Sequence, residues 1–435
     1  MAQIQLKNCC LVGADEIVQG DILLRGGLIE SRGTKSVYKE VLDCTGKYVV
    51  PGFVDIHFHG YNLFDFTLGK FDPESGSFDN SMEAFTAGIN MLRETLAGFG
   101  VTRFYIASFA APIKKLSNCF GNLAQYLWNE DNPTKGARLE GGLLEGSFIN
   151  PQMAGAQSAG HILEMSSEVF EQIGGKNTIK LVNVVPDFGH RSTQLIKYLS
   201  DKGIVVGFGH TNATCEQITK AIGANLKYCI HFTNGPTGGS YKPFNGGGAI
   251  EGVLKSNGLY AELIADGYHV NPEYLRDIIA RKGVDKVIGA TDCMLAGGSA
   301  LKRFDMLDVK AQVSANGQYI SVAGKDNTLC GSNLTMDRGF RNILNLLSSD
   351  GSGIWYRQHK AMPFAEALRA AVKMYSSNPC KLTGLSREGY GVAAAGARAD
   401  LCVLDIQGKP GDYTVKVETT IVDGEVVYSG KKKGA

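Results

Sequence analysis

The feature that most constrains the fold is a regular alternation, through the middle of the chain, of short apolar runs with helical stretches. The eight apolar runs span residues 48–57, 101–108, 139–145, 178–185, 204–210, 226–231, 259–266 and 286–292. Helical patterns intervene at residues 81–99, 113–128, 192–201, 214–222 and 272–281. Continuous apolar runs separated by helices are typical of parallel strands joined by crossover helices. The pattern therefore predicts an α/β fold of the (β/α)₈ barrel type, with an active site at the C-terminal ends of the strands.

Both ends of the chain have the pattern of short β-strands instead. Strand patterns precede the barrel at residues 4–12, 17–24 and 28–30, and follow it at 399–404, 419–422 and 425–428. The last two flank Asp423-Gly424, which is a strong hairpin signal. Neither end is long enough to bury a core alone, so we expect the two to pair. The predicted domains are residues 1–50 and 396–435, which together form a small β-sandwich, and residues 51–395, which form the barrel.

Composition narrows the class of protein. The 435 residues carry 44 Lys and Arg against 43 Asp and Glu, a net charge of +1, and 44% of them are hydrophobic. This balance argues against a nucleic-acid-binding protein and against a disordered chain. No apolar run approaches the ~18–20 residues that cross a bilayer, and no secretory leader is evident, so no membrane association is expected. The ten cysteines form no CxxC pair, which favours reduced thiols and a cytoplasmic location.

Side chains that bind metals or move protons lie at the ends of the predicted barrel strands. His57 and His59 form an HxH motif at the end of the first strand. Four more such residues end later strands: Glu145, His210, His231 and Asp292. Singly, each has an ordinary structural explanation, such as a hydrogen-bonded histidine or a turn aspartate. Together, imidazoles and a carboxylate on one rim are the ligand set of a divalent transition metal such as Zn or Fe.

A metal held in this way would supply hydrolytic chemistry. It lowers the pKa of a bound water from about 15.7 toward about 7 and polarises a substrate carbonyl. Asp292 is the natural proton shuttle from the attacking water to a leaving nitrogen. We therefore expect hydrolysis of an amide or a similar carbonyl bond. Cys293 has no better claim to be a nucleophile than to be a core residue.

At this point the sequence resembles a known family. The segment PGFVDIHFHG at 51–60 resembles the opening motif of the amidohydrolase superfamily. The N-acetylglucosamine-6-phosphate deacetylase family is indicated by LEGSFINP (144–151), GHTNA (209–213), HFTN (231–234), ADGYHV (265–270), TDCM (291–294), GSNLTMD (331–337), NP (378–379) and 396–400. The similarity runs in order from about residue 48 to residue 405.

The resemblance implies roles for individual residues. Glu145, His210 and His231 match the ligands of the main metal. His57 and His59 match a pair that binds a second metal in some members, with Glu145 as a bridge, so one or two ions are implied. Asp292 matches the catalytic acid/base, and His269 matches a residue that contacts the substrate and helps to polarise its carbonyl. Asn234 and Gly235 match a segment that holds the sugar phosphate. The implied partner is a small N-acyl amino sugar phosphate, and the implied assembly is a homodimer.

Three departures from the family pattern bear on the substrate, and the first is Ser147, which stands where members have proline beside the metal. Gln157 stands where members have a histidine that contacts the sugar. Lys242 stands where members place an arginine on the phosphate, and lysine is a point charge rather than a bidentate fork. Three functions are compatible with these residues: N-acetylglucosamine-6-phosphate deacetylase, deacylase of an unphosphorylated or different N-acyl amino sugar or other small amide, and non-catalytic binding protein. The stretch 61–80 has two interpretations, a specificity loop or a passive insertion.

Overall fold

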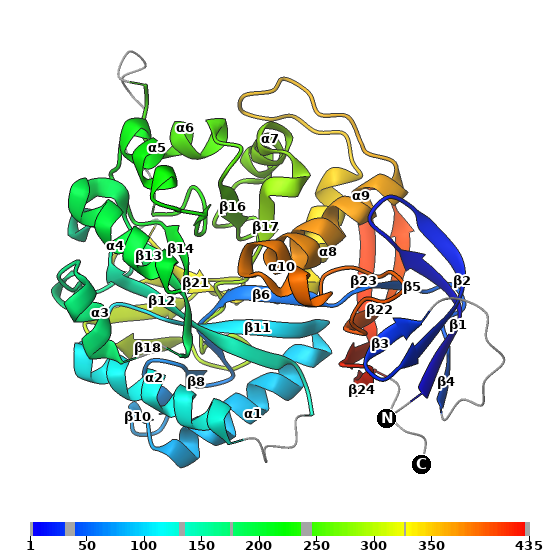
Figure 1. Ribbon diagram of the computed structural model, residues 1–435, viewed down its shortest axis with the longest axis horizontal. Coiled ribbons are helices and arrows are strands. Elements are labelled where there is room, and N and C mark those ends of the chain that lie inside the picture. The colour runs from blue at the N-terminus through cyan, green and yellow to red at the C-terminus, as the bar shows by residue number, and fades with distance from the viewer. Residues whose placement is uncertain are drawn as a thin grey trace.

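A barrel of eight parallel strands forms the larger part of the computed structural model, which describes residues 3–30, 40–129, 135–174, 177–235, 246–325 and 328–430 (Figure 1). The strands are β6 (Phe53–Phe58), β11 (Val101–Ser108), β12 (Arg138–Phe148), β13 (Ile179–Val184), β14 (Val205–Phe208), β15 (Tyr228–Cys229), β16 (Tyr260–Leu263) and β17 (Val287–Gly289). Each strand pairs with its neighbours in chain order. The predicted (β/α)₈ barrel is confirmed.

The barrel closes between its first strand and the segment that follows its last. The backbone N–H of Asp292 donates to the carbonyl of His57 at 2.8 Å, and Phe58 forms a parallel bridge with Cys293. The hydroxyl of Thr291 donates to the buried carboxylate of Asp55 at 2.6 Å. The seam between β6 and residues 291–293 therefore depends on side chains as well as on backbone pairing.

The five predicted helices are present, and others accompany them. The helices are α1 (Met82–Gly98), α2 (Ile113–Trp128), α3 (Ser167–Ile173), α4 (His190–Asp201), α5 (Cys215–Gly223), α6 (Ala249–Lys255), α7 (Pro272–Lys282), α8 (Met336–Leu347), α9 (Phe364–Val372) and α10 (Asn378–Thr383). Their starts are encoded locally. The Ser81 hydroxyl accepts from Ala84 N at the start of α1, and Thr214 forms a capping box with Gln217 at the start of α5.

Two small antiparallel sheets lie outside the barrel and were not predicted. One consists of β7 (Gly60–Tyr61), β8 (Phe64–Asp65), β9 (Gly69–Asp72) and β10 (Ser77–Asp79). The other consists of β18 (Arg303–Met306), β19 (Val309–Val313), β20 (Tyr319–Val322) and β21 (Leu329–Ser332). The first falls within the stretch 61–80, which is thus a folded element.

The two ends of the chain meet in one further sheet. Its strands are β1 (Gln3–Val12), β2 (Ile17–Arg25), β3 (Leu28–Glu30), β4 (Glu40–Asp43), β5 (Tyr48–Pro51), β22 (Leu401–Lys409), β23 (Asp412–Val422) and β24 (Glu425–Ser429). The antiparallel pair β5–β22 joins the N-terminal and C-terminal parts. The sheet encloses its own small apolar core, which includes Leu6, Leu24 and Leu401. This arrangement agrees with the predicted β-sandwich, while the domain boundaries remain a proposal.

The run predicted as a single strand at 48–57 is divided in two. Residues 48–51 belong to the terminal sheet as β5, and the barrel strand β6 starts at Phe53. Gly52 lies between them, where a Cβ atom would be 2.1 Å from the side chain of Thr102. Only glycine allows the chain to pass this close to β11 as it moves from one sheet to the other.

A buried ion network fastens the barrel to the terminal sheet. The Arg103 side chain on β11 is 7% exposed and bonds Asp400 Oδ2 at 2.8 Å and Asp423 Oδ1 at 2.9 Å, and it also contacts Glu140. Its guanidinium lies 3.7 Å from the ring centroid of Tyr390. Because Asp400 is buried, removal of Arg103 would leave its carboxylate without an ion-pair partner.

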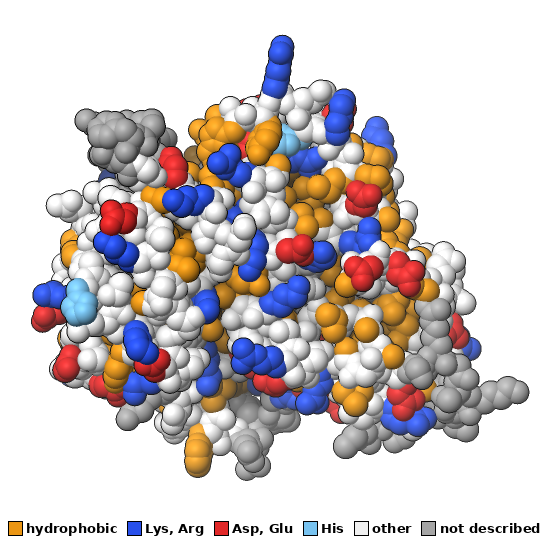
Figure 2. Space-filling model, turned by 45° about the horizontal axis from the view of Figure 1, so that its top comes forward, with side chains coloured by type: hydrophobic (Ala, Val, Ile, Leu, Met, Phe, Trp, Pro, Cys, Tyr) orange, Lys and Arg blue, Asp and Glu red, His pale blue; other side chains and the backbone are white. Residues whose placement is uncertain are grey.

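The described surface shows no single dominant charge. On the face seen in Figure 2, basic and acidic side chains are interspersed. In the part of the chain that the structure describes, no helix combines the length and the apolarity needed to cross a bilayer.

We predict that Arg103→Met lowers the free energy of unfolding by about 3–5 kcal/mol, because it leaves the buried carboxylate of Asp400 without its cation. Arg138→Met is the matched control, since Arg138 also bonds Asp423, at 2.9 Å, but its side chain is 37% exposed. The control should cost about 0–1 kcal/mol. Denaturant unfolding monitored by circular dichroism compares the two, and equal midpoints would contradict the importance of the network.

Candidate functional site

Six side chains predicted from strand ends meet at the C-terminal end of the barrel. His57 lies on β6 and His59 just beyond it, and Glu145 lies on β12. His210, His231 and Asp292 follow β14, β15 and β17. Two sets have donor atoms close enough to share a metal ion: His57, His59 and Glu145 form one, and Glu145, His210 and His231 form the other. The structure thus brings together the residues that the sequence singled out.

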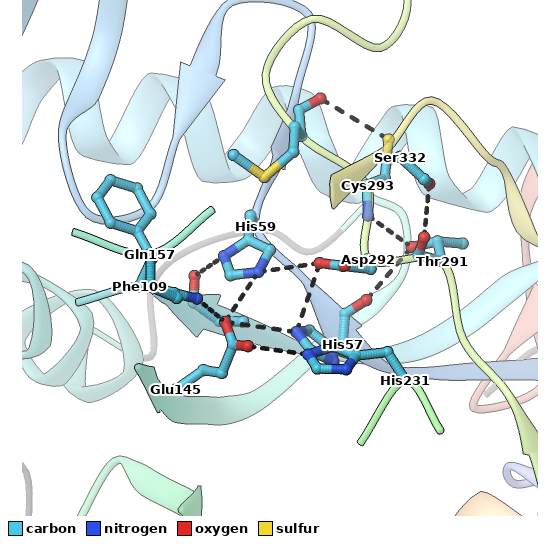
Figure 3. A network of polar contacts seen from close by, with 12 residues as sticks. His57, His59, Phe109, Glu145, Gln157, His231, Thr291, Asp292, Cys293 and Ser332 are labelled. Carbon is cyan, nitrogen blue, oxygen red and sulfur yellow. Dashed lines mark hydrogen bonds and ion pairs between the residues drawn. The ribbon is translucent and has the colours of Figure 1, made fainter. Parts of the chain in front are cut away.

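Glu145 is the centre of this arrangement (Figure 3). Its Oε1 lies 3.2 Å from His231 Nε2 and 3.3 Å from His210 Nε2. Its Oε2 lies 3.4 Å from His59 Nε2 and 3.8 Å from His57 Nε2. Each carboxylate oxygen therefore faces one pair of imidazoles, and all the side chains involved are buried.

The opposite nitrogen of each ring is held by an acceptor. His57 Nδ1 lies 2.8 Å from Glu262 Oε1, and the other three Nδ1 atoms bond the carbonyl oxygens of Ala107 (3.0 Å, from His59), Met153 (3.0 Å, from His210) and Asn234 (2.7 Å, from His231). A carbonyl oxygen can only accept, so Nδ1 carries a hydrogen, and in the neutral ring Nε2 presents a lone pair to the site. Such hydrogen bonds set the tautomer and orientation of metal-ligating histidines.

The electrostatics of the site call for positive charge. Burial lowers the pKa of His59, but its hydrogen bonds with Asp292 and Glu145 outweigh burial and raise the pKa to about 9. Burial raises the pKa of Glu145, yet hydrogen bonds from the surrounding imidazoles bring it well below its usual value. Lone pairs that face carboxylate oxygens repel them unless a cation or a proton lies between. A proton or a metal ion must therefore occupy the space between them.

The residues fit a divalent transition metal. Zn–N bonds of about 2.0–2.1 Å in a tetrahedral site place neighbouring ligand atoms about 3.3 Å apart. The Glu145 Oε1 distances of 3.2 and 3.3 Å match this spacing. In addition, His57 Nε2 is buried without a hydrogen-bond partner among the described residues. A ring nitrogen in that position is well placed to be a ligand.

Asp292 lies next to the HxH pair. Its Oδ1 is 3.1 Å from His59 Nε2 and 3.5 Å from His57 Nε2. Burial raises its pKa, but the neighbouring imidazoles, His57 first, lower it to about 2. The backbone of Asp292 is fixed on both sides, since its N–H donates to His57 O and its carbonyl accepts from Ser332 N at 2.7 Å.

The backbone is strained at three of these positions. His210, His231 and Asp292 have φ angles of +55°, +27° and +51°. Residues other than glycine rarely adopt this left-handed region, and such strain of about 1–3 kcal/mol each clusters at functional sites. All three follow a barrel strand, so the same abrupt turn delivers each side chain to the rim.

A cavity of about 260 Å³ opens over these residues. Its polar lining includes Gln157, Ser158, Asn234, Gly235 and His269. Its apolar lining consists mainly of Phe109, Met294, Met306, Val309, Leu329 and Cys330. Phe109 lies beside His59, with 6.4 Å between ring centroids, so the apolar wall is on the HxH side. The cavity offers one ligand both a polar and an apolar surface.

The predicted substrate-binding residues are placed as follows. His269 Nδ1 bonds Asp266 Oδ2 at 2.7 Å, and the His269 carbonyl accepts from Asn234 Nδ2 at 2.8 Å. Gly235, with φ +70°, lies against His210, where a Cβ atom would be 2.8 Å from Nδ1. Lys242 lies outside the described residues.

The stretch 61–80 is not part of the cavity lining. Its residues instead contact the backbone of the site next to the HxH motif and after β11. Phe66 N donates to the His59 carbonyl at 3.0 Å, and Thr67 Oγ1 accepts from Phe109 N at 3.3 Å. Phe64 and Phe66 are buried against α1 residues such as Phe85. This contact pattern favours a structural support for β6 and argues against a specificity loop.

Two buried carboxylates of the site were not predicted. Glu262 on β16 accepts from His57 Nδ1 and from His231 N, at 2.8 and 3.0 Å. Asp55 on β6 accepts from Thr291 across the seam, and burial raises its pKa to about 7. Each is the only acidic residue of its strand, and the other residues of the two strands are apolar or aromatic apart from His57. That interruption is the signal that could have revealed them.

Comparison with known proteins agrees with this geometry. The model of the amidohydrolase family matches residues 156–427. An N-acetylglucosamine-6-phosphate deacetylase from Bos taurus is 28% identical over 442 residues, covering 98% of this chain and 95% of the relative. One from Bacillus subtilis (strain 168) is 28% identical over 354 residues, covering 78% and 81%.

Solved structures share the fold. A mutant N-acetyl-D-glucosamine-6-phosphate deacetylase from Mycobacterium smegmatis, in complex with N-acetyl-D-glucosamine-6-phosphate, matches with a TM-score of 0.78 and 23% identity. The match covers 99% of this chain and 100% of that one. The N-acetylglucosamine-6-phosphate deacetylase from Thermotoga maritima matches with a TM-score of 0.76 and 24% identity, covering 98% and 100%.

We predict that Glu262→Ala weakens Zn²⁺ binding by roughly 10- to 100-fold, because His57 loses the acceptor that fixes its tautomer. Glu262→Gln keeps an oxygen acceptor and should lose less. Chelator competition with metal-free protein measures the affinity, and circular dichroism checks the fold. Glu74→Ala, at an exposed turn, is the control. Wild-type affinity in both Glu262 variants would show that this carboxylate does not act on the site.

Proposed function

The chain belongs to the amidohydrolase family, and on that premise we propose that it hydrolyses the acetamide of N-acetylglucosamine-6-phosphate. The observation that carries this proposal is the convergence of four imidazole Nε2 atoms on Glu145, with Asp292 beside them in the cavity. The curated relatives that match most of the chain support the choice of substrate. The products are the free amine and acetate.

The proposed metal ligands are His57, His59, Glu145, His210 and His231, which would hold one or two divalent ions, Zn or Fe. A metal bound there supplies Lewis acidity and a water of lowered pKa. Glu145 would bridge two ions, because its two oxygens face different pairs of histidines.

Asp292 performs the proton transfers in this proposal. It accepts a proton from the water that attacks the carbonyl carbon and passes it to the amide nitrogen as the C–N bond breaks. Its low pKa keeps its carboxylate ionised at neutral pH. His269 is proposed to face the carbonyl oxygen and stabilise its developing charge. The hydrogen bond to Asp266 holds the His269 ring in place.

Recognition of the sugar is proposed for the polar side of the cavity. Asn234 lies next to His231, and Gly235 lies next to His210. A substrate held by this segment has its amide close to these two candidate metal ligands. The apolar wall near His59 suits the methyl group of acetyl. Lys242 is proposed to meet the phosphate.

A second candidate is a deacylase of an unphosphorylated N-acyl amino sugar. The observation that favours it is the charge of the cavity: among its described lining residues there is neither Lys nor Arg. This candidate keeps the same hydrolysis and the same proton shuttle, and it changes only the polar end of the substrate.

We further propose a cytoplasmic location, supported by the absence of any disulfide among the ten cysteines. The homodimer implied by the family resemblance stays a prediction, which light scattering of the purified protein would check.

Acetate release from N-acetylglucosamine-6-phosphate and from N-acetylglucosamine tests the proposal. We expect turnover that chelation abolishes and that added Zn²⁺ or Fe²⁺ restores. If Lys242 serves a competent phosphate site, kcat/KM should be at least about 100-fold higher for the phosphorylated sugar. A preference for the unphosphorylated sugar would favour the second candidate. No turnover of either by metal-loaded protein would exclude both.

We predict that Asp292→Asn lowers kcat by about 10²- to 10⁴-fold, because an amide cannot accept the proton from water. Asparagine tolerates the positive φ at this position, so the fold should be kept. Steady-state kinetics and metal analysis of the same preparation separate the effects. A variant with normal metal content and near-normal kcat would contradict the proton-shuttle role.

A further inference from the structure

The amide of Gln157 is held at both ends inside the site, and Figure 3 shows its contact with Glu145. Its Oε1 accepts from Ala110 N at 2.7 Å, and its Nε2 donates to Glu145 Oε2 at 2.9 Å. A backbone N–H can only donate, so the amide oxygen must face Ala110. The orientation of the amide is thereby determined, and the nitrogen necessarily faces the carboxylate.

The space for this amide is built into β12. Gly146, directly after Glu145, has a φ of +78°, and a Cβ atom there would lie 2.4 Å from Ala110 N and 2.6 Å from Gln157 Oε1. A larger residue would push the Gln157 amide away from Ala110. Strand β12 therefore carries Glu145 and, at Gly146, also leaves the space that the Gln157 amide occupies.

The hydrogen bond falls on one particular oxygen of Glu145. Oε1 faces His210 and His231, whereas Oε2 faces the HxH pair and accepts from Gln157. The terminal torsion of a glutamate is broad, so a carboxylate without a fixed donor can rotate. The Gln157 amide selects the rotation in which each oxygen faces one pair of histidines.

We propose that Gln157 is a positioning residue that holds Glu145 in its bridging orientation, and that it is not the sugar contact expected from its place in the family pattern. This inference rests on the proposed function, because it concerns the same metal ligands. The Gln157 amide has four hydrogen-bonding positions. One on its oxygen is used by Ala110 N, and one on its nitrogen is used by Glu145 Oε2. Recognition of the sugar then falls mainly to Asn234 and His269.

The test compares Gln157→Leu with Gln152→Leu. Leucine is similar in size to glutamine and cannot donate a hydrogen bond. Gln152 is an exposed glutamine five positions away that does not line the cavity, so its variant should match the wild type. Gln157→Met, with an unbranched apolar side chain, serves as a second variant if the leucine variant does not fold.

Two measurements apply to each protein. The first is a Co²⁺ titration of metal-free protein followed by visible absorption, where we expect Gln157→Leu to weaken binding roughly 10- to 100-fold and to change the spectrum. The second is steady-state kinetics at saturating metal. There we expect kcat to fall at least about tenfold, while KM for the sugar phosphate stays within about threefold of the wild type.

The outcomes separate this inference from the function on which it rests. A raised KM with unchanged kcat and unchanged Co²⁺ binding would make Gln157 a substrate contact and overturn the inference. Wild-type behaviour of both Gln157 variants would also overturn it. If the wild-type chain itself neither binds Co²⁺ nor releases acetate, the proposed function fails, and the inference fails with it.

Discussion

The site depends on one electrostatic constraint: buried carboxylates and imidazoles cannot share this space without a cation. Glu145 presents an oxygen to each pair of histidines, and the Nδ1 atoms of those rings are all committed to acceptors. The Nε2 atom of each ring therefore faces the Glu145 carboxylate. Desolvated groups of this kind are costly unless they are compensated. The rest of the barrel end is arranged around the positive charge that compensates them.

Closing the barrel and assembling the site are the same structural event. The seam between β6 and residues 291–293 is made by the backbone of His57 and Asp292 and by the Asp55–Thr291 hydrogen bond. Residues more than 200 positions apart in sequence thus reach their working distance only when the last strand docks on the first. The sheet β7–β10 supports this edge from outside, through Phe66 and Thr67.

Features of the fold and the site that depend on local sequence patterns could be predicted, whereas those that depend on contacts between separate segments could not. His210 and Asp292 end apolar runs, so strand periodicity alone placed them on the rim. Glu262 bonds His57, 205 positions away, and Gln157 bonds Glu145, 12 positions away. The acidic residue within β16 marks a polar site, but no local pattern indicates either contact. The helix α8 was not predicted, although Met336, Phe340, Ile343, Leu344 and Leu347 have helical spacing. By contrast, α10 begins at Asn378-Pro379, where proline argues against a helix that continues from α9. Several strands of β7–β10 are only two or three residues long, too short for alternation to register.

The left-handed backbone at His210, His231 and Asp292 lowers the stability of the fold at the positions that the proposed activity requires. Replacing these residues with glycine would relieve torsional strain while removing two proposed metal ligands and the proposed proton shuttle. In a lineage released from selection for turnover, mutations at these positions would be tolerated by the fold, and some would improve it. The barrel fold would then persist after the activity was lost, and an inactive descendant would be the more stable protein.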